Sequence, residues 1–169
     1  MAPTSKYARI EIERRFLLPP DVDELITTEL PRRVIIDNYI IGTNLRLREM
    51  DNEGEKVYKL TKKTNLSPGR EELTTIYLSR EEYQSLSVLP AMVVSKVRFI
   101  LTSDDNTIGI DTYGNEEDEL SLAEVEFETE EQMNAFVLPM PYEVEVTGKE
   151  EFSGFALANR FGWQNRQFQ

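Results

Sequence analysis

The chain has 169 residues, a formal net charge of −12, no cysteine and no histidine. This length suits one domain, predicted over residues 6–163, and the absence of Cys and His excludes thiol nucleophiles, metals held by Cys, and imidazole as base or ligand. The acidic balance argues against nucleic-acid and membrane partners, and the absence of a signal-peptide pattern or a bilayer-length apolar run predicts a cytoplasmic protein.

Short alternating segments separated by turn signals run along the whole chain, a pattern typical of an antiparallel sheet or barrel. Ser79 and Thr129 are predicted N-caps, because Glu82 and Gln132 follow at the capping-box position. The predicted helices are 21–30, 80–87, 130–137 and 151–160. The predicted strands are 8–17, 34–42, 44–50, 55–63, 70–78, 93–101, 107–113, 121–128 and 142–147.

Charged residues occupy one face of most of these strands, since residues two apart in a strand point to the same side. In 8–17, Glu11, Glu13 and Arg15 share a face opposite Ile10 and Ile12. The same pattern recurs in Arg46 and Arg48; Lys59, Thr61 and Lys63; Arg70, Glu72 and Thr74; Lys96 and Arg98; Asp111 and Tyr113; and Glu124, Glu126 and Glu128.

A single strand of this kind would simply expose its charges to water. Taken together, the strands indicate a different arrangement, because the predicted helices need an apolar surface to cover. If the helices pack outside, the charged faces turn inward. The predicted fold is therefore mainly β, of the α+β class, a closed antiparallel barrel with helices packed outside. A structural β-domain with salt bridges across an exposed sheet is the alternative.

The cations and carboxylates are unevenly distributed along the sequence. Residues 1–100 carry 16 Lys and Arg against 15 Asp and Glu, whereas 101–169 carry 3 against 16. Arg and Lys suit phosphate oxygens, and paired carboxylates suit Mg²⁺ or Mn²⁺. A polyphosphate chelated by a divalent cation fits such an interior, and its chemistry needs positioning and charge neutralisation rather than His or Cys.

The segment Glu11-Ile12-Glu13-Arg14-Arg15 resembles the Glu-x-Glu-x-Lys signature of the CYTH domains, also called triphosphate tunnel metalloenzymes, with Arg15 in the Lys place. The resemblance covers about residues 8–160. It continues through Leu45-Arg46-Leu47-Arg48, Tyr58-Lys59-Leu60-Thr61-Lys62-Lys63, Gly69-Arg70-Glu71-Glu72, Lys96-Val97-Arg98, Ile110-Asp111, Leu122-Ala123-Glu124-Val125-Glu126-Phe127 and Val144-Glu145-Val146-Thr147.

The resemblance implies an eight-stranded tunnel that hydrolyses or cyclises triphosphate compounds with Mg²⁺ or Mn²⁺. It implies catalytic roles for Glu11, Glu13 and Arg15, although Arg15 cannot readily lose a proton as a Lys could. The implied metal-site positions are Glu11, Glu13, Asp111, Glu124 and Glu126. The implied phosphate-binding positions are Arg46, Arg48, Lys59, Lys63, Arg70, Lys96 and Arg98.

The favoured function is metal-dependent hydrolysis of a triphosphate, with inorganic triphosphate as substrate, because no segment is built to recognise a nucleoside or thiamine. A class IV adenylyl cyclase or thiamine triphosphatase is one alternative, in which Tyr39, Tyr58 or Tyr113 would stack at a tunnel mouth. A polyphosphate- or nucleotide-binding module with little turnover is another. The oligomeric state stays open, and a homodimer is compatible with the sequence.

Overall fold

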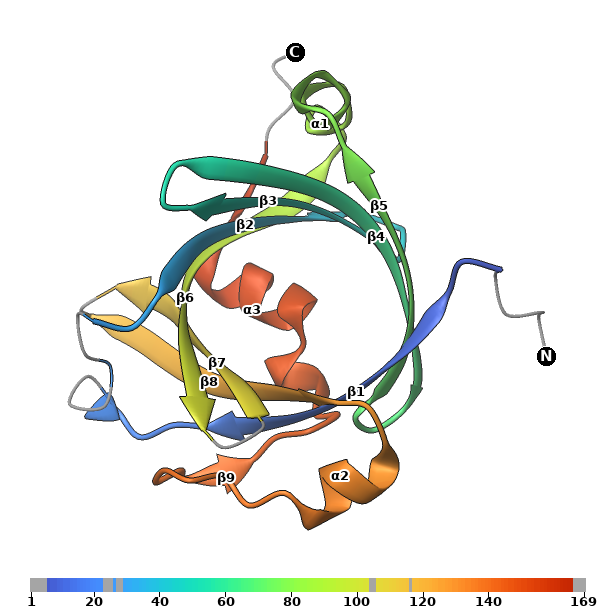
Figure 1. Ribbon diagram of the computed structural model, residues 1–169. Helices are drawn as coiled ribbons and strands as arrows, with labels where there is room; N and C mark the ends of the chain where they lie inside the picture. The colour runs from blue at the N-terminus through green and yellow to red at the C-terminus, as the bar shows by residue number, and fades with distance from the viewer. Residues whose placement is uncertain (1–5, 23–25, 27–28, 104–105, 116, 166–169) are drawn as a thin grey trace.

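The wall of the molecule is an antiparallel β-barrel, seen nearly end-on in Figure 1. The computed structural model describes residues 6–22, 26, 29–103, 106–115 and 117–165. Within them, eight strands follow one another in the order β6-β2-β3-β4-β5-β1-β8-β7, and pairing of β6 with β7 closes the ring. They are β1 Arg9–Leu17, β2 Arg32–Ile40, β3 Leu45–Asn52, β4 Glu55–Ser67, β5 Arg70–Leu78, β6 Ala91–Ser103, β7 Asn106–Asn115 and β8 Asp118–Phe127. The closed eight-stranded barrel is confirmed.

Two short strands and the helices complete the described fold. The strand β9, Val144–Glu145, pairs with β1, and β10, Trp163–Gln164, pairs with β6. The helices are α1 Arg80–Leu86, α2 Glu130–Ala135, the 3₁₀ turn η2 Glu150–Phe152 and α3 Gly154–Phe161. Both predicted capping boxes form. The predicted strand 142–147 is reduced to β9. Residues 23–25 and 27–28 of the predicted helix 21–30 lie outside the described residues.

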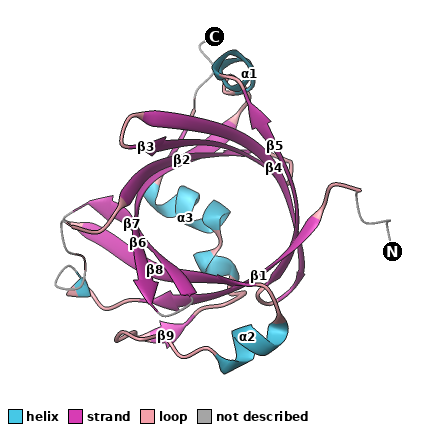
Figure 2. Cartoon of the chain, in the orientation of Figure 1, coloured by secondary structure: helices cyan, strands magenta, loops and turns pink. Residues whose placement is uncertain are grey.

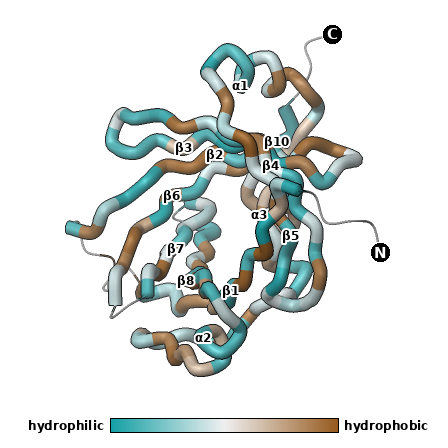
Figure 3. The backbone as a smooth tube through the Cα atoms, turned by 45° about the vertical axis from the view of Figure 1, so that its right-hand side comes forward, coloured by the Kyte–Doolittle hydropathy of each residue, from teal (hydrophilic) through white to brown (hydrophobic). Residues whose placement is uncertain are grey.

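Polar and apolar residues alternate along the strands of the wall (Figure 3). In β1 and β8 the apolar residues lie on the face opposite to Arg15 and Glu124. Phe16, Ile110 and Val125 form an outer cluster that also takes in Leu138, with Phe136 packed against it. The helices α1 and α2 lie outside the ring (Figure 2), α1 against β4 and β5 and α2 against β1 and β8. The placement of α1 and α2 on the outer, apolar surface of the barrel agrees with the sequence prediction.

The last helix, α3, instead closes one end of the barrel and is seen inside the ring in Figure 1. Its buried residues Leu157 and Ala158 pack with Val94, Tyr113 and Leu122. Val94 shares the strand face of Lys96, so α3 packs on the inner surface of the wall. Helix placement outside the barrel is therefore wrong for α3, because the inner face is apolar at this end and offers the helix a partner there.

Candidate active site

Strand register decides which predicted residues face the lumen, since directly paired residues of antiparallel strands lie on the same face. Arg15 pairs with Glu124, Arg98 with Asp111, and Arg48 with Lys59. The structure thus brings to one interior all predicted site residues but one, namely Glu11, Glu13, Arg15, Arg46, Arg48, Lys59, Lys63, Lys96, Arg98, Asp111, Glu124 and Glu126.

Arg70 is the exception, and its assigned face was wrong. It pairs with Ile12 and points to the outer surface, where it forms an ion pair with Glu130 at the start of α2. The lumen residue of this strand is Glu71, which pairs with Glu11. Both faces of β5 carry polar side chains, so alternation alone could not tell which face is inside.

Three carboxylates gather where β1 meets β5. One oxygen each of Glu11, Glu13 and Glu71 lie within 4.8 Å of one another. The Lys63 ammonium lies 3.5 Å from Glu11 and forms a closer ion pair with Glu71. Glu71 was not predicted as a site residue, and only the pairing of β5 with β1 reveals it.

Burial and repulsion between neighbouring carboxylates disfavour the ionised form of Glu13. Desolvation, then Glu124 and Glu11, raise the pKa of Glu13 to about 7, against the opposing effect of Arg15. A divalent cation would relieve this repulsion, and oxygen donors are the ligands that Mg²⁺ and Mn²⁺ prefer. Glu11, Glu13 and Glu71 therefore fit such an ion. Asp111, Glu124 and Glu126 do not join them in the described structure.

Arg15 links this group to Glu124 on the neighbouring strand β8. Its Nε lies 3.1 Å from Glu13 Oε1 and its Nη2 3.0 Å from Glu124 Oε2, while Nη1 donates to the Phe152 carbonyl at 3.2 Å. A planar five-donor guanidinium can make such divergent contacts at once, whereas an ammonium cannot reach them all. Arg15 is thus held as a fixed positive charge between two carboxylates.

A second cluster surrounds Asp111. Lys96 Nζ donates to Asp111 at 2.6 Å, and the Arg98 guanidinium donates to both its oxygens at 2.6 Å and to Glu124 at 2.9 Å. Burial opposes ionisation, yet Lys96 and Arg98 lower the pKa of Asp111, and Arg98 and Arg15 lower that of Glu124. Both carboxylates are therefore ionised partners of the lumen cations in this structure.

Asp37 anchors a third cluster that sequence analysis missed. Arg48 donates to both Asp37 oxygens, at 2.6 and 2.8 Å, and Arg46 Nε lies 3.7 Å away. Despite the cost of burial, these two arginines hold the pKa of Asp37 well below its usual range. The sequence feature that could have identified Asp37 is a single acidic residue within a largely apolar strand, on the same strand face as Tyr39. Asp37 is paired with both arginines and is therefore placed to orient their guanidinium groups.

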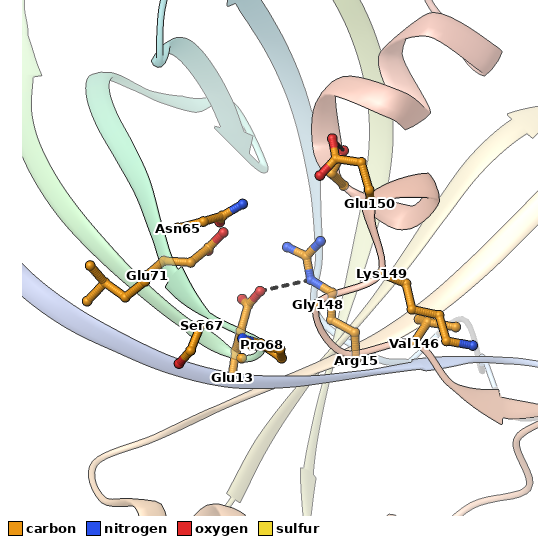
Figure 4. A pocket seen from close by; sticks show the side chains of 13 residues that line it. Glu13, Arg15, Asn65, Ser67, Pro68, Glu71, Val146, Gly148, Lys149 and Glu150 are labelled. Atoms are coloured by element: carbon orange, nitrogen blue, oxygen red, sulfur yellow. Dashed lines mark hydrogen bonds and ion pairs between the residues drawn. The ribbon is translucent and has the colours of Figure 1, made fainter.

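Two cavities approach the charged interior from opposite ends. The mouth cavity, about 780 Å³, lies at the open end and is lined by residues that include Arg33, Arg98, Thr107, Glu124 and Glu126. The side cavity, about 250 Å³, lies beside α3 and is lined by residues that include Glu13, Arg15, Ser67, Glu71, Lys149 and Ser153 (Figure 4).

Comparisons with known proteins identify the fold. No protein-family model and no curated protein matches the chain. Among solved structures, the inorganic triphosphatase NE1496 shares 24% identity and a TM-score of 0.56, over 88% of this chain and 97% of that one. A putative adenylate cyclase from Bacillus halodurans shares 17% identity, with a TM-score of 0.54 over 83% and 97%.

A third structure, the PH1819 protein from Pyrococcus horikoshii OT3, shares 19% identity and a TM-score of 0.52, over 73% of this chain and 82% of that one. These likenesses confirm the tunnel fold that the sequence resemblance implied. Separately, none of the helices in the described part of the chain has the length and apolar character needed to cross a membrane.

Proposed function

We propose that the chain hydrolyses triphosphate compounds, with inorganic triphosphate as the favoured substrate and Mg²⁺ or Mn²⁺ as cofactor. The observation that carries this proposal is the meeting of opposite charges inside one barrel. The carboxylate group Glu11, Glu13 and Glu71 lies against a lumen that also holds Lys63, and the same lumen carries further cations at Arg46, Arg48, Lys59, Lys96 and Arg98.

The cations would bind the triphosphate. Arg48 and Arg98 are held by Asp37 and Asp111, so their guanidinium groups are oriented before any ligand arrives. Such preorganisation lowers the free energy needed to order side chains on binding and lets several cations neutralise successive phosphates. Arg15 would hold Glu13 and Glu124 in place and stabilise negative charge on a phosphoryl oxygen.

The carboxylate group would hold the metal ion. When bound, Mg²⁺ or Mn²⁺ would neutralise phosphate charge and lower the pKa of a coordinated water. Because its guanidinium keeps its proton, Arg15 would act through charge and orientation rather than by taking a proton from water. The inorganic triphosphatase among the structures with this fold supports the assignment.

The test is phosphate release from inorganic triphosphate with Mg²⁺ or Mn²⁺, comparing the native chain with a Glu11→Gln/Glu13→Gln variant. We expect metal-dependent release, reduced at least about 100-fold by the double substitution, since a bound metal contributes several kcal/mol to transition-state stabilisation. Glu143→Gln/Glu151→Gln, which neutralises two exposed carboxylates outside the lumen, is the control and should keep full activity.

Failure of the native chain to release phosphate, with triphosphate still binding, would replace the hydrolase assignment with a binding module. Equal losses in the site and control variants would show that the effect is general and not due to the carboxylate group.

An organic triphosphate is the second candidate, and one lumen residue favours it. The three tyrosines considered from the sequence all pack elsewhere, Tyr39 and Tyr113 against α3 and Tyr58 against Tyr83 of α1. Tyr77, however, faces the lumen side opposite Lys59 and is 71% exposed, with the Lys59 ammonium 5.0 Å from its ring centre. Faster turnover of ATP or thiamine triphosphate than of inorganic triphosphate would support this candidate.

A further inference from the structure

The chain of ion pairs through Arg15 lies between the two cavities of the interior. Glu13 and Arg15 line the side cavity, whereas Glu124, which Arg15 contacts at 3.0 Å, lines the mouth cavity. Two of the three grouped carboxylates, Glu13 and Glu71, line the side cavity, and no member of that group lines the mouth cavity. The carboxylate group is thus approached from the side opposite to the mouth.

The side cavity leads from this group to the surface. Its outer wall includes the exposed residues Ser67, at the end of β4, and Lys149, in the segment before η2. The two walls meet tightly at Gly148, where an added Cβ would lie 2.7 Å from Pro68 Cα. Gly148 also has a φ of +70°, which favours glycine. Close packing here, and the cap of α3 at Ser153, define the edge of the opening.

The charge of the side cavity favours cations. Three carboxylates, Glu13, Glu71 and Glu150, line it together with two cations, Arg15 and Lys149. Arg15 is already paired with Glu13 and Glu124, and Figure 4 shows Lys149 extending away from Glu13 and Glu71. A polyanion entering here would meet carboxylates, whereas a divalent cation would be attracted to them.

The geometry points to the side cavity as the route by which a divalent cation and its water molecules reach Glu13 and Glu71, an inference that rests on the proposed function. The metal thereby approaches Glu13 and Glu71 from the end of the barrel at which α3 lies, and not through the mouth cavity.

Site-specific labelling tests this route, because the chain has no cysteine and each variant carries a single thiol. Ser67→Cys and Lys149→Cys place the thiol on the two walls of the side cavity, and Thr107→Cys places it in the mouth cavity. Ser85→Cys, on the exposed face of α1, is the control. Each variant is treated with a bulky fluorescein maleimide or with a small methanethiosulfonate that adds only a thiomethyl group.

Two measurements are made with Mn²⁺ alone: the equilibrium dissociation constant, from the resonance of the free ion, and the enhancement of water-proton relaxation by the bound ion. The bulky label on either wall of the side cavity should remove most of the relaxation enhancement while the dissociation constant stays unchanged. The small label there, and either label on Ser85→Cys, should leave both values unchanged. The bulky label on Thr107→Cys, in the mouth cavity, should preserve the enhancement.

Full enhancement after bulky labelling of both side-cavity variants would overturn the inference while leaving the proposed function intact. Loss of equilibrium Mn²⁺ binding in those variants would overturn it too, since the cavity would then belong to the metal site itself. Absence of Mn²⁺ binding in the unlabelled native chain would remove the metal part of the proposed function and the inference together.

Discussion

Lys96 is a buried lumen cation with a lowered pKa. Burial, followed by repulsion from Arg98 and Arg48, lowers its pKa to about 8, although Asp111 acts in the opposite direction. A lowered lysine pKa means that the charged form destabilises the empty fold at low pH, and that this cost begins to decrease at about pH 8 and is lost only as the pH approaches the usual lysine pKa. Bound phosphate would stabilise the ammonium form of Lys96 and would therefore raise its pKa.

Affinity for inorganic triphosphate should therefore fall as the pH rises above about 8, by up to about tenfold per pH unit, because binding must then return a proton to Lys96. In Lys96→Arg the guanidinium stays charged, so the affinity should change less over the same range. Metal-free calorimetric titration in buffers of different ionisation enthalpy measures both the affinity and the proton uptake. Identical pH profiles for the two proteins would contradict the assignment of this titration to Lys96.

Arg14, next to Arg15 in β1, ties α2 and β9 to the outside of the barrel. It donates to both Glu145 oxygens, at 2.9 and 2.7 Å, and to the carbonyls of Met133 and Phe136, at 3.1 and 2.8 Å. Thr147 donates to the same Glu145 carboxylate at 2.7 Å and accepts from the Arg15 amide at 3.0 Å. One side chain thus couples the end of α2 to the strand that carries the site.

The variant Arg14→Lys should lower the free energy of unfolding by about 2–3 kcal/mol, because an ammonium cannot replace the fork that joins a carboxylate and two carbonyls. Arg70→Lys is the matched control: Arg70 also binds α2, through Glu130, but their side chains are 40% and 47% exposed. Arg70→Lys should lower the free energy of unfolding by less than about 1 kcal/mol. Urea unfolding measures both, and comparable small losses would show that Arg14 does not hold the element.

Amide hydrogen exchange measures whether Arg14→Lys loosens α2 and the segment leading to β9 locally. In Arg14→Lys, the amides of α2 and of the segment leading to β9 should exchange faster, while those of β3 and β4 should not. Uniformly faster exchange would indicate general destabilisation instead of local release.

At the scale of the whole molecule, the barrel brings together charges that repel one another. Arg33 stands directly opposite Arg98 across β2 and β6, and Lys59 opposite Arg48 across β3 and β4. Like charges in such pairs destabilise a sheet unless they are neutralised. Asp37 and Asp111 neutralise part of this charge, and an anion in the lumen would neutralise more.

Inorganic triphosphate at about 100 times its dissociation constant should stabilise the fold by about 2.7 kcal/mol, which corresponds to a Tm increase of about 5–10 °C for a chain of this size. Orthophosphate at the same concentration should raise Tm less, because it reaches fewer cations. Thermal unfolding with a metal chelator, at constant ionic strength to separate screening from binding, gives the comparison. An equal effect of the two anions would indicate surface binding rather than occupation of the lumen.

Much of the fold and of the site follows from the sequence, because strand alternation has a period of two and each charged residue is assigned to a face by its neighbours. The pattern of Glu11, Glu13 and Arg15 against Ile10 and Ile12 sufficed to place these residues on one face. The capping boxes at Ser79 and Thr129 likewise depend on residues only three positions apart, so they too could be predicted.

Tertiary structure decided what local patterns leave undetermined. The choice between Arg70 and Glu71 required the pairing of β5 with β1, since both faces of β5 are polar. The carboxylate group joins residues about 60 positions apart, and the role of Asp37 depends on two arginines in the next strand. The end that α3 closes was decided by apolar lumen residues from β6, β7 and β8, which the pairing of these three strands places on one inner surface. The strands of the wall and their charged faces could be predicted because they depend on residues close together in the chain. Which charges meet inside the barrel, and from which end they can be reached, depends on contacts between residues far apart in the chain.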